Sequence, residues 1–192
     1  MRIGVLAAQG AFVEHIARLR RLEVEALAVR LPHELAGLDG LIIPGGESTT
    51  ITKLMLDYNL TGEIRNLAKN GLPIFGTCAG MIILANKTPD LEIEPLGLMN
   101  IRVRRNAFGR QIDSFETELS IPVLGKKPFT GIFIRAPIIE QATGEVEILA
   151  KLADGTSVAA RQGKLLVSAF HPELTDDLRF HQYFLDIVAG QQ

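Results

Sequence analysis

The sequence predicts an α/β fold: a doubly wound mixed sheet with helices on both faces and antiparallel strand additions in the second half of the chain. Two patterns indicate this. Over the first 85 residues, short and continuously apolar runs alternate with segments whose apolar residues recur at helical spacing. From residue 98 onward, short strand-like runs are separated by turn residues. Strands that alternate with helices imply parallel βαβ units with right-handed crossovers, and hairpin-like runs imply antiparallel pairing.

The first half of the chain is expected to hold four strands and several helices. The strands are apolar runs of the kind found in parallel sheets buried on both faces, and cover residues 3–8, 24–29, 40–43 and 73–77. The first helix carries apolar residues at helical spacing, namely Phe12, Ile16, Leu19 and Leu22. Ser48 or Thr49 can cap the next helix, and a further helix around residues 63–69 stops at Asn70-Gly71. This order of elements predicts a flavodoxin-like sheet.

The second half is expected to add antiparallel strands to that sheet. The candidate strands are residues 98–104, 115–121, 131–135, 146–152, 157–160 and 165–169. Asp154-Gly155 is a good hairpin turn, and Gln162-Gly163 is a weaker one. A final helix is predicted over residues 177–188.

Composition narrows the class of protein. With 47% hydrophobic and 22% charged residues, and with no repeat or long linker, residues 1–192 are expected to form a single domain. The net charge of −2 gives no reason to expect nucleic acid or an anionic membrane as partner. Cys78 is the only cysteine, which excludes an internal disulfide and fits a reducing compartment. The apolar run at the N-terminus is too short to span a membrane, so we expect a cytoplasmic protein.

Cys78 stands at the centre of Gly76-Thr77-Cys78-Ala79-Gly80, between a predicted strand and a predicted helix. A G-x-C-x-G turn in this place resembles the nucleophile elbow of hydrolases, with cysteine in place of serine. Small neighbours let the side chain at the apex project outward. A small buried hydrophobe in a strand is the alternative interpretation, because free cysteines are commonly buried.

His171 is the best partner for this thiol. It follows the apolar run at residues 165–170 and stands in His171-Pro172-Glu173. Ligand-binding loops of doubly wound sheets gather at one edge, so His171 and Cys78 can meet there. Glu173 can then turn back to the second imidazole nitrogen, which gives a nucleophile, a base and an orienting carboxylate. The alternative is a simple turn before the last helix. Of the other histidines, His15 and His33 are expected at the surface, and His181 is expected to be packed or solvated.

Two loops offer donors for an oxyanion. Pro44-Gly45-Gly46-Glu47-Ser48 follows the third strand and opens a helix, and the backbone N–H of Ala79 follows the nucleophile. A phosphate-binding loop is the alternative for the glycine-rich segment, but the lysine of a P-loop is missing. A metal site is poorly supported, because the sequence has neither a cysteine pair nor two histidines at ligand spacing.

Together these motifs resemble the class I, or triad, glutamine amidotransferases. The broad resemblance rests on Gln9-Gly10, the Pro44–Ser48 string, the Cys78 elbow and His171-Pro172-Glu173. More narrowly, the chain is similar to the glutaminase subunits of pyridoxal 5′-phosphate synthases. That similarity rests on three further strings: residues 104–111 (Arg-Arg-Asn-Ala-Phe-Gly-Arg-Gln), 133–137 (Phe-Ile-Arg-Ala-Pro) and 179–184 (Arg-Phe-His-Gln-Tyr-Phe). Ala7-Ala8 departs from the family pattern, where a bulkier residue is expected.

The resemblance implies a mechanism and a set of site residues. Cys78 would attack the side-chain carboxamide of L-glutamine, His171 would protonate the leaving ammonia, and Glu173 would orient His171. Water would then hydrolyse the glutamyl thioester. The oxyanion would be held by Gly46 and Ala79. The glutamine site of the family corresponds here to Gly46, Glu47, Ser48, Arg105, Ile134 and Arg135. An arginine suits the α-carboxylate of glutamine and Glu47 suits its α-ammonium, although Arg105 can also be read as a solvated basic strand end.

The resemblance further implies a partner and no cofactor. Such glutaminases pass ammonia to a pyridoxal 5′-phosphate synthase subunit in a large hetero-oligomer, and they are poorly active alone. A Gly45–Gly46 peptide that takes its working conformation only on docking would explain that dependence. Two alternatives stay open: the glutaminase of another amidotransferase, such as imidazole glycerol phosphate synthase, or a non-hydrolytic chaperone or redox protein with a cysteine elbow.

Overall fold

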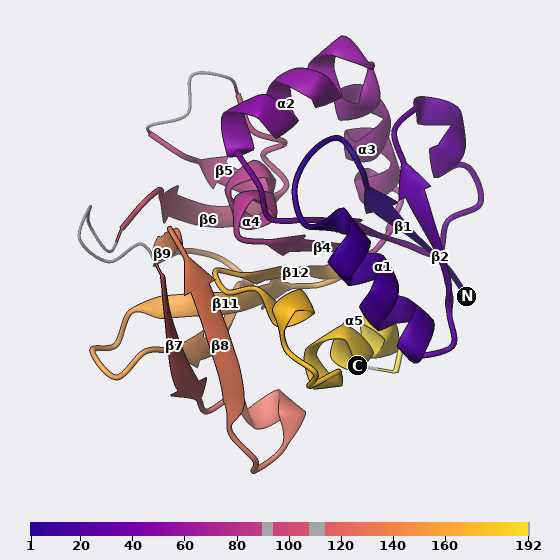
Figure 1. Cartoon of the computed structure of the whole chain (residues 1–192). Helices are drawn as coiled ribbons and strands as arrows, with labels where there is room; N and C mark the ends of the chain where they lie inside the picture. Colours follow the sequence, from indigo (N-terminus) through magenta and orange to yellow (C-terminus); the bar gives the residue numbers. More distant parts are fainter. Residues whose placement is uncertain (90–93, 108–113, 192) are drawn as a thin grey trace.

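The computed structural model describes residues 1–89, 94–107 and 114–191 (Figure 1). Its large sheet has the strand order β2-β1-β3-β4-β12-β11-β9-β6-β5, and β10 pairs with β11. The strands of this sheet are β1 (Arg2–Leu6), β2 (Glu25–Val29), β3 (Gly40–Ile43), β4 (Ile74–Thr77), β5 (Ala85–Lys87), β6 (Met99–Arg104), β9 (Ile138–Ala142), β10 (Glu147–Lys151), β11 (Ser157–Gln162) and β12 (Leu165–Ser168).

The centre of the sheet is parallel. Strands β2, β1, β3, β4 and β12 run in one direction, and every residue of β3 and β4 is buried. Strands buried on both faces need continuous apolar sequence, which is why these runs were recognisable. The loops that leave the carboxyl ends of β1, β3, β4 and β12 therefore start at the same edge of the sheet.

Helices cover both faces, as predicted. The α-helices are α1 (Phe12–Arg21), α2 (Ser48–Asp57), α3 (Leu60–Lys69), α4 (Ala79–Leu84) and α5 (Arg179–Val188). Short 3₁₀ turns are η1 (Pro32–Leu35), η2 (Pro122–Leu124) and η3 (Pro172–Leu174). In Figure 1, α2, α3 and α4 lie above the parallel strands, and α1 and α5 lie below them. No helix in the described part of the chain is long and apolar enough to cross a membrane.

The second half adds antiparallel pairs, as expected, through β11–β12, β10–β11, β9–β11 and β6–β9. The two predicted hairpin turns are confirmed: Gly155 and Gly163 have φ values of +88° and +55° in the connections between these strands. Two strands of the sheet were missed. Strand β5 has only three residues and follows α4 directly, and β9 mixes apolar and polar residues (Ile-Ile-Glu-Gln-Ala) without a clean alternation.

Two predicted additions do not join the large sheet. Strands β7 (Ser114–Leu119) and β8 (Phe129–Ile134) pair with each other in a separate two-stranded sheet. Their aromatic side chains explain the separation. Phe133 stacks on Phe115 with 4.6 Å between ring centroids, and Phe129 and Phe133 each lie 5.7 Å from the ring of Phe170. The hairpin thus buries its rings against the segment that leads to His171, and an edge position in the large sheet would expose them.

Candidate active site

Cys78 lies at a sharp turn between β4 and α4. Its backbone has φ +50° and ψ −102°, a strained conformation for a residue with a side chain. The N–H of Cys78 donates to the carbonyl of Ser168 at 2.7 Å, which ties the turn to the end of β12. Glycine is required on one side because a Cβ at Gly80 would collide with the carbonyl oxygen of Ile43. The tight packing of this turn holds the thiol at the carboxyl edge of the sheet.

His171 and Glu173 form a buried pair three residues beyond β12. The Nδ1 atom of His171 lies 2.7 Å from Oε1 of Glu173, whose side chain is completely buried. The backbone N–H of His171 donates to the carbonyl of Ile132 in β8 at 2.8 Å. Nε2 of His171 makes no full hydrogen bond to any described residue, so it is the nitrogen that remains for the thiol and a substrate.

Gly45 brings the imidazole and the cysteine together. A Cβ built on Gly45 would collide with Cε1 of His171 and would lie 3.3 Å from Cβ of Cys78. Both side chains therefore pack against the same glycine. The thiol sulfur lies 3.9 Å from the carbonyl oxygen of Ile134, on the other side of the site.

The charges of this site favour an imidazolium. Burial of the His171 ring opposes its charged form, but the neighbouring Cys78 and Glu173 outweigh that cost and raise the pKa of His171 to about 10. Burial also opposes ionisation of Glu173, but His15 and His171 outweigh it and lower the pKa of that carboxyl. A protonated imidazole beside a cysteine is the arrangement that activates a thiol as a nucleophile.

The glycine-rich loop after β3 is fastened from two sides. The N–H of Ala11 donates to the carbonyl of Gly45 at 3.0 Å, and the N–H of Gly45 donates to Oγ1 of Thr77 at 3.0 Å. The side chain of Gln9 accepts from the N–H of Glu47 at 2.8 Å. In a trans peptide the N–H points opposite to the carbonyl, so the N–H of Gly46 points away from Ala11.

A pocket of about 250 Å³ lies over these groups. Cys78 and His171 line it, as do all six residues predicted for substrate binding: Gly46, Glu47, Ser48, Arg105, Ile134 and Arg135. Glu173 lies behind His171, outside the lining, and so does Ala79. Gln9, Ile82 and Asn106 also line the pocket; Gln9 and Asn106 stood in motifs that the sequence singled out, and Ile82 did not. A larger hollow of about 540 Å³, lined by Met1, Pro73 and Lys164 among others, contains none of the predicted site residues.

Several residues that line this pocket have strained backbone conformations. Among the described residues, five other than glycine have positive φ, and three of these line the pocket: Cys78, Asn106 and Arg135. Such conformations persist only where the surrounding structure enforces them, and they cluster at functional sites. Residues 108–111, the rest of the string that begins at Arg104, lie outside the described residues.

Glu47 caps a helix, which the sequence did not predict. Its carboxylate caps α2, accepting from the N–H of Thr49 at 3.1 Å and of Thr50 at 2.7 Å, so the expectation that Ser48 or Thr49 is the cap was wrong. The longer side chain of Glu47 reaches both amides from one residue earlier. Oε1 of Glu47 also lies 3.4 Å from Nη2 of Arg105, which is only 22% exposed. Arg105 is therefore a pocket residue and not a solvated strand end.

His15 was expected at the surface, and this was wrong. Its side chain is completely buried, with Nδ1 2.9 Å from Nε2 of His181, and Nε2 3.1 Å from Oγ1 of Thr77 and 3.4 Å from Oε2 of Glu173. The polar neighbours of His15 in the sequence suggested exposure. Its spacing gave the better signal, because His15 lies four residues before Leu19 and shares the buried face of α1.

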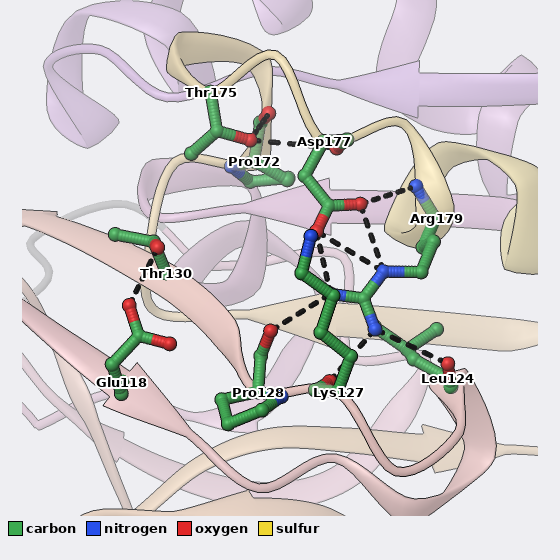
Figure 2. A network of polar contacts seen from close by, with 9 residues as sticks. All are labelled: Glu118, Leu124, Lys127, Pro128, Thr130, Pro172, Thr175, Asp177 and Arg179. Atoms are coloured by element: carbon green, nitrogen blue, oxygen red, sulfur yellow. Dashed lines mark hydrogen bonds and ion pairs between the residues drawn. The ribbon is translucent and has the colours of Figure 1, made fainter.

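The segment that carries Glu173 is fastened further along by Arg179 (Figure 2). The Arg179 guanidinium binds the carboxylate of Asp177, with Nη2 2.6 Å from Oδ2. It also donates to three backbone carbonyls before and at the start of β8, those of Leu124, Lys127 and Pro128. Figure 2 shows these bonds converging on one guanidinium, which joins the β7–β8 hairpin to the start of α5. We call this group the Arg179 clasp.

Comparison with known proteins identifies the family. Residues 5–189 match the model of the SNO glutamine amidotransferase family. The chain belongs to this family. Over 98% of its length it is 58% identical to the pyridoxal 5′-phosphate synthase subunit PdxT of Moorella thermoacetica, all of which is covered. It is 57% identical over 97% of its length to the PdxT subunit of Herpetosiphon aurantiacus, again covering all of that protein.

A solved structure agrees with the SNO family assignment. The crystal structure of a glutamine amidotransferase superposes with a TM-score of 0.93 at 49% identity, covering 98% of this chain and 100% of the other. The predicted fold class and the predicted family are thereby confirmed. Among the described residues of this SNO family member, no group of three or more His, Cys, Asp or Glu side chains is arranged to hold a metal ion.

Proposed function

We propose that residues 1–192 act as a single glutamine amidotransferase domain, the glutaminase subunit of a pyridoxal 5′-phosphate synthase. The observation that carries this proposal is the position of the His171 ring, which contacts Glu173 at 2.7 Å and packs with Cys78 against Gly45. The relatives of similar length are named as subunits of that synthase, which supports a synthase subunit as partner. A free cysteine at the site fits a reducing compartment, which supports the cytoplasm as its location.

The proposed chemistry follows from the groups that face the pocket. Sγ of Cys78 attacks the side-chain carboxamide carbon of L-glutamine, and the protonated Nε2 of His171 gives its proton to the departing ammonia. Glu173 holds Nδ1 and keeps the ring in that orientation. The N–H groups of Gly46 and Ala79 stabilise the oxyanion. Water, deprotonated by His171, then hydrolyses the thioester and releases glutamate.

Substrate binding uses the charges at the mouth of the pocket. Glu47 and Arg105 already lie in contact, so the site presents one negative and one positive group side by side. The α-ammonium of glutamine would face Glu47, and its α-carboxylate would face Arg105, with Arg135 as a second cation. Ser48 and the backbone of Ile134 would complete the site.

The test is glutamate release in the presence and absence of the synthase subunit. We expect Cys78→Ala to abolish glutamate release and to leave ring synthesis from added ammonium intact. His171→Ala should abolish glutamate release in the same way, whereas His33→Ala, at an exposed histidine in η1, should not change it. If Cys78→Ala also stopped ammonium-dependent synthesis, the chain would not serve as a separate ammonia supplier.

A further inference from the structure

A network of buried polar side chains lies behind Glu173 and has no part in the chemistry described so far. His15, His181 and Thr77 are all completely buried. His15 is the centre of this network. Its Nδ1 lies 2.9 Å from Nε2 of His181, and its Nε2 lies 3.1 Å from Oγ1 of Thr77 and 3.4 Å from Oε2 of Glu173. The hydroxyl oxygen of Thr77 in turn accepts from the N–H of Gly45 at 3.0 Å. His15 thus contacts the orienting carboxylate of Glu173 directly, and it contacts the oxyanion loop through Thr77.

The contacts select one arrangement of the ring protons. If Nε2 of His15 carries the proton, it donates toward Thr77 Oγ1 and Oε2 of Glu173, and Nδ1 accepts from Nε2–H of His181. The unprotonated Nδ1 of His181 is then an acceptor without a partner among the described residues, and Oε2 of Glu173, which makes no full hydrogen bond to them, lies 3.4 Å from the Nε2–H of His15. In the reverse arrangement a lone pair of His15 would face the Glu173 carboxylate, and His181 would bury an unpaired N–H. A buried carboxylate oxygen and a buried N–H both need partners, so the first arrangement is favoured.

Burial opposes the charged form of both imidazoles in this network. Burial lowers the pKa of His15 despite the opposing attraction of Glu173, and burial together with the nearby His15 and Arg18 lowers the pKa of His181 well below its ordinary range. Among the described residues, Glu173 is a completely buried carboxylate that is held at Oε1 by His171 and whose Oε2 lies 3.4 Å from Nε2 of His15. Apolar residues of the same size would fill these positions without the cost of burying polar nitrogens, so packing alone does not account for two imidazoles here.

We propose that His15 is a positioning residue of the glutaminase reaction: its Nε2–H holds Oε2 of Glu173 and the hydroxyl of Thr77, and so fixes the carboxylate that orients His171 together with the loop that carries Gly45. This inference rests on the proposed function. His15 does not touch the pocket, and it acts only through Glu173 and Thr77. Its loss should therefore lower kcat, because the imidazole and the oxyanion loop lose their alignment, and should leave KM for glutamine nearly unchanged.

Two amide variants of similar polarity separate a positioning role from a packing role. In His15→Gln the amide nitrogen reaches about as far as Nε2 of histidine and can still donate to Glu173 and Thr77. In His15→Asn the amide reaches only as far as Nδ1, toward His181. We expect kcat for glutamate release, measured with the synthase subunit present, to fall about 10- to 100-fold in His15→Asn, the range for a buried acceptor left without its donor. The fall in His15→Gln should be less than about fivefold, and KM should stay within about twofold in both.

Thermal unfolding of the same proteins provides the control, because a packing role predicts that activity follows stability. If the two variants lost activity equally, or in proportion to their loss of Tm, the positioning role would be wrong. Thr77→Val and Thr77→Ser supply a second test should the His15 variants fold poorly: valine removes the hydroxyl that accepts from Gly45, and serine keeps it. We expect a loss in kcat of about 10-fold or more for valine only, and equal kcat in the two would also overturn the proposal. Failure of Cys78→Ala to abolish glutamate release would instead overturn the proposed function itself.

Discussion

The two halves of the chain hold their parts of the site by different means. In the first half, Cys78 and Gly45 follow fully buried parallel strands and lie in close packing that admits only glycine at positions 45 and 80. In the second half, His171 and Glu173 depend on side-chain hydrogen bonds to each other, and the Arg179 clasp fastens the segment beyond them. A side chain added at a tightly packed glycine causes a steric clash that the neighbouring backbone cannot relieve. Removal of one side chain from a hydrogen-bond network costs only the interactions of that side chain.

Gly80→Ala should produce the largest loss of stability, because it disrupts the close backbone packing at the turn that carries Cys78. The added methyl group would collide with the carbonyl oxygen of Ile43, which β3 holds in place. We expect a loss of about 3 kcal/mol or more in the free energy of unfolding, measured by urea denaturation.

Gly62→Ala is the matched control in the same half. Gly62 lies in α3, and a Cβ there would meet nothing within 4 Å. Alanine is the better helix former, so this variant should be unchanged or more stable by up to about 1 kcal/mol. Equal destabilisation by both substitutions would mean that the tight contact at Gly80 does not control the stability of the elbow.

Arg179→Ala should produce an intermediate effect, because it removes the centre of a side-chain network. The guanidinium binds Asp177 and three backbone carbonyls, and its loss leaves those acceptors without their donor. We expect a loss of about 2 kcal/mol by urea denaturation.

Arg102→Ala is the matched control in the second half. Arg102 lies 3.2 Å from Glu140 in an ion pair in which the arginine is 46% exposed, and such pairs contribute little. Its replacement should change stability by no more than about 0.5 kcal/mol. If the two arginine variants were equally stable, the Arg179 clasp would be no more than a surface ion pair.

The same difference between the halves decides how much the sequence could predict. The parallel strands were recognised within one or two residues, because burial on both faces demands an unbroken apolar run. Cys78, His171 and Glu173 were singled out in the sequence because turns with glycine or proline have local signatures. Strands β5 and β9 were missed because they are short or irregular in pattern, and their place depends on the neighbouring strands.

Contacts between residues far apart in the sequence had no such local signature. His15 and His181 are 166 residues apart, and nothing near either residue indicates that they meet behind Glu173. The separation of β7–β8 from the large sheet depends likewise on aromatic contacts with Phe170, a residue far from both strands in the sequence. Such features follow from the assembled fold, in which α1 and α5 cover the same face of the sheet.

Glu47 contacts Arg105 where the two halves meet, and its replacement should produce a smaller effect than the loss of Gly80 or of Arg179. Partial burial opposes ionisation of Glu47, but hydrogen bonds from Thr50 and Thr49 outweigh it and lower the pKa of the carboxyl to about 2. Its stabilising contribution is therefore present above the ordinary pKa of about 4.5 and is lost as the pH falls toward 2. At pH 7, Glu47→Ala should cost about 1 kcal/mol, the usual value of a helix cap.

Urea denaturation of the parent and of Glu47→Ala, at pH 7 and at pH 3, measures this contribution directly. Other carboxyl groups titrate in both proteins, so the informative quantity is the difference in stability between them. That difference should shrink on acidification, because below pH 4.5 the unfolded parent binds a proton at Glu47 that the folded parent, with its pKa of about 2, does not yet bind. A difference that stayed constant between the two pH values would show that the Glu47 carboxylate does not stabilise α2 through its charge.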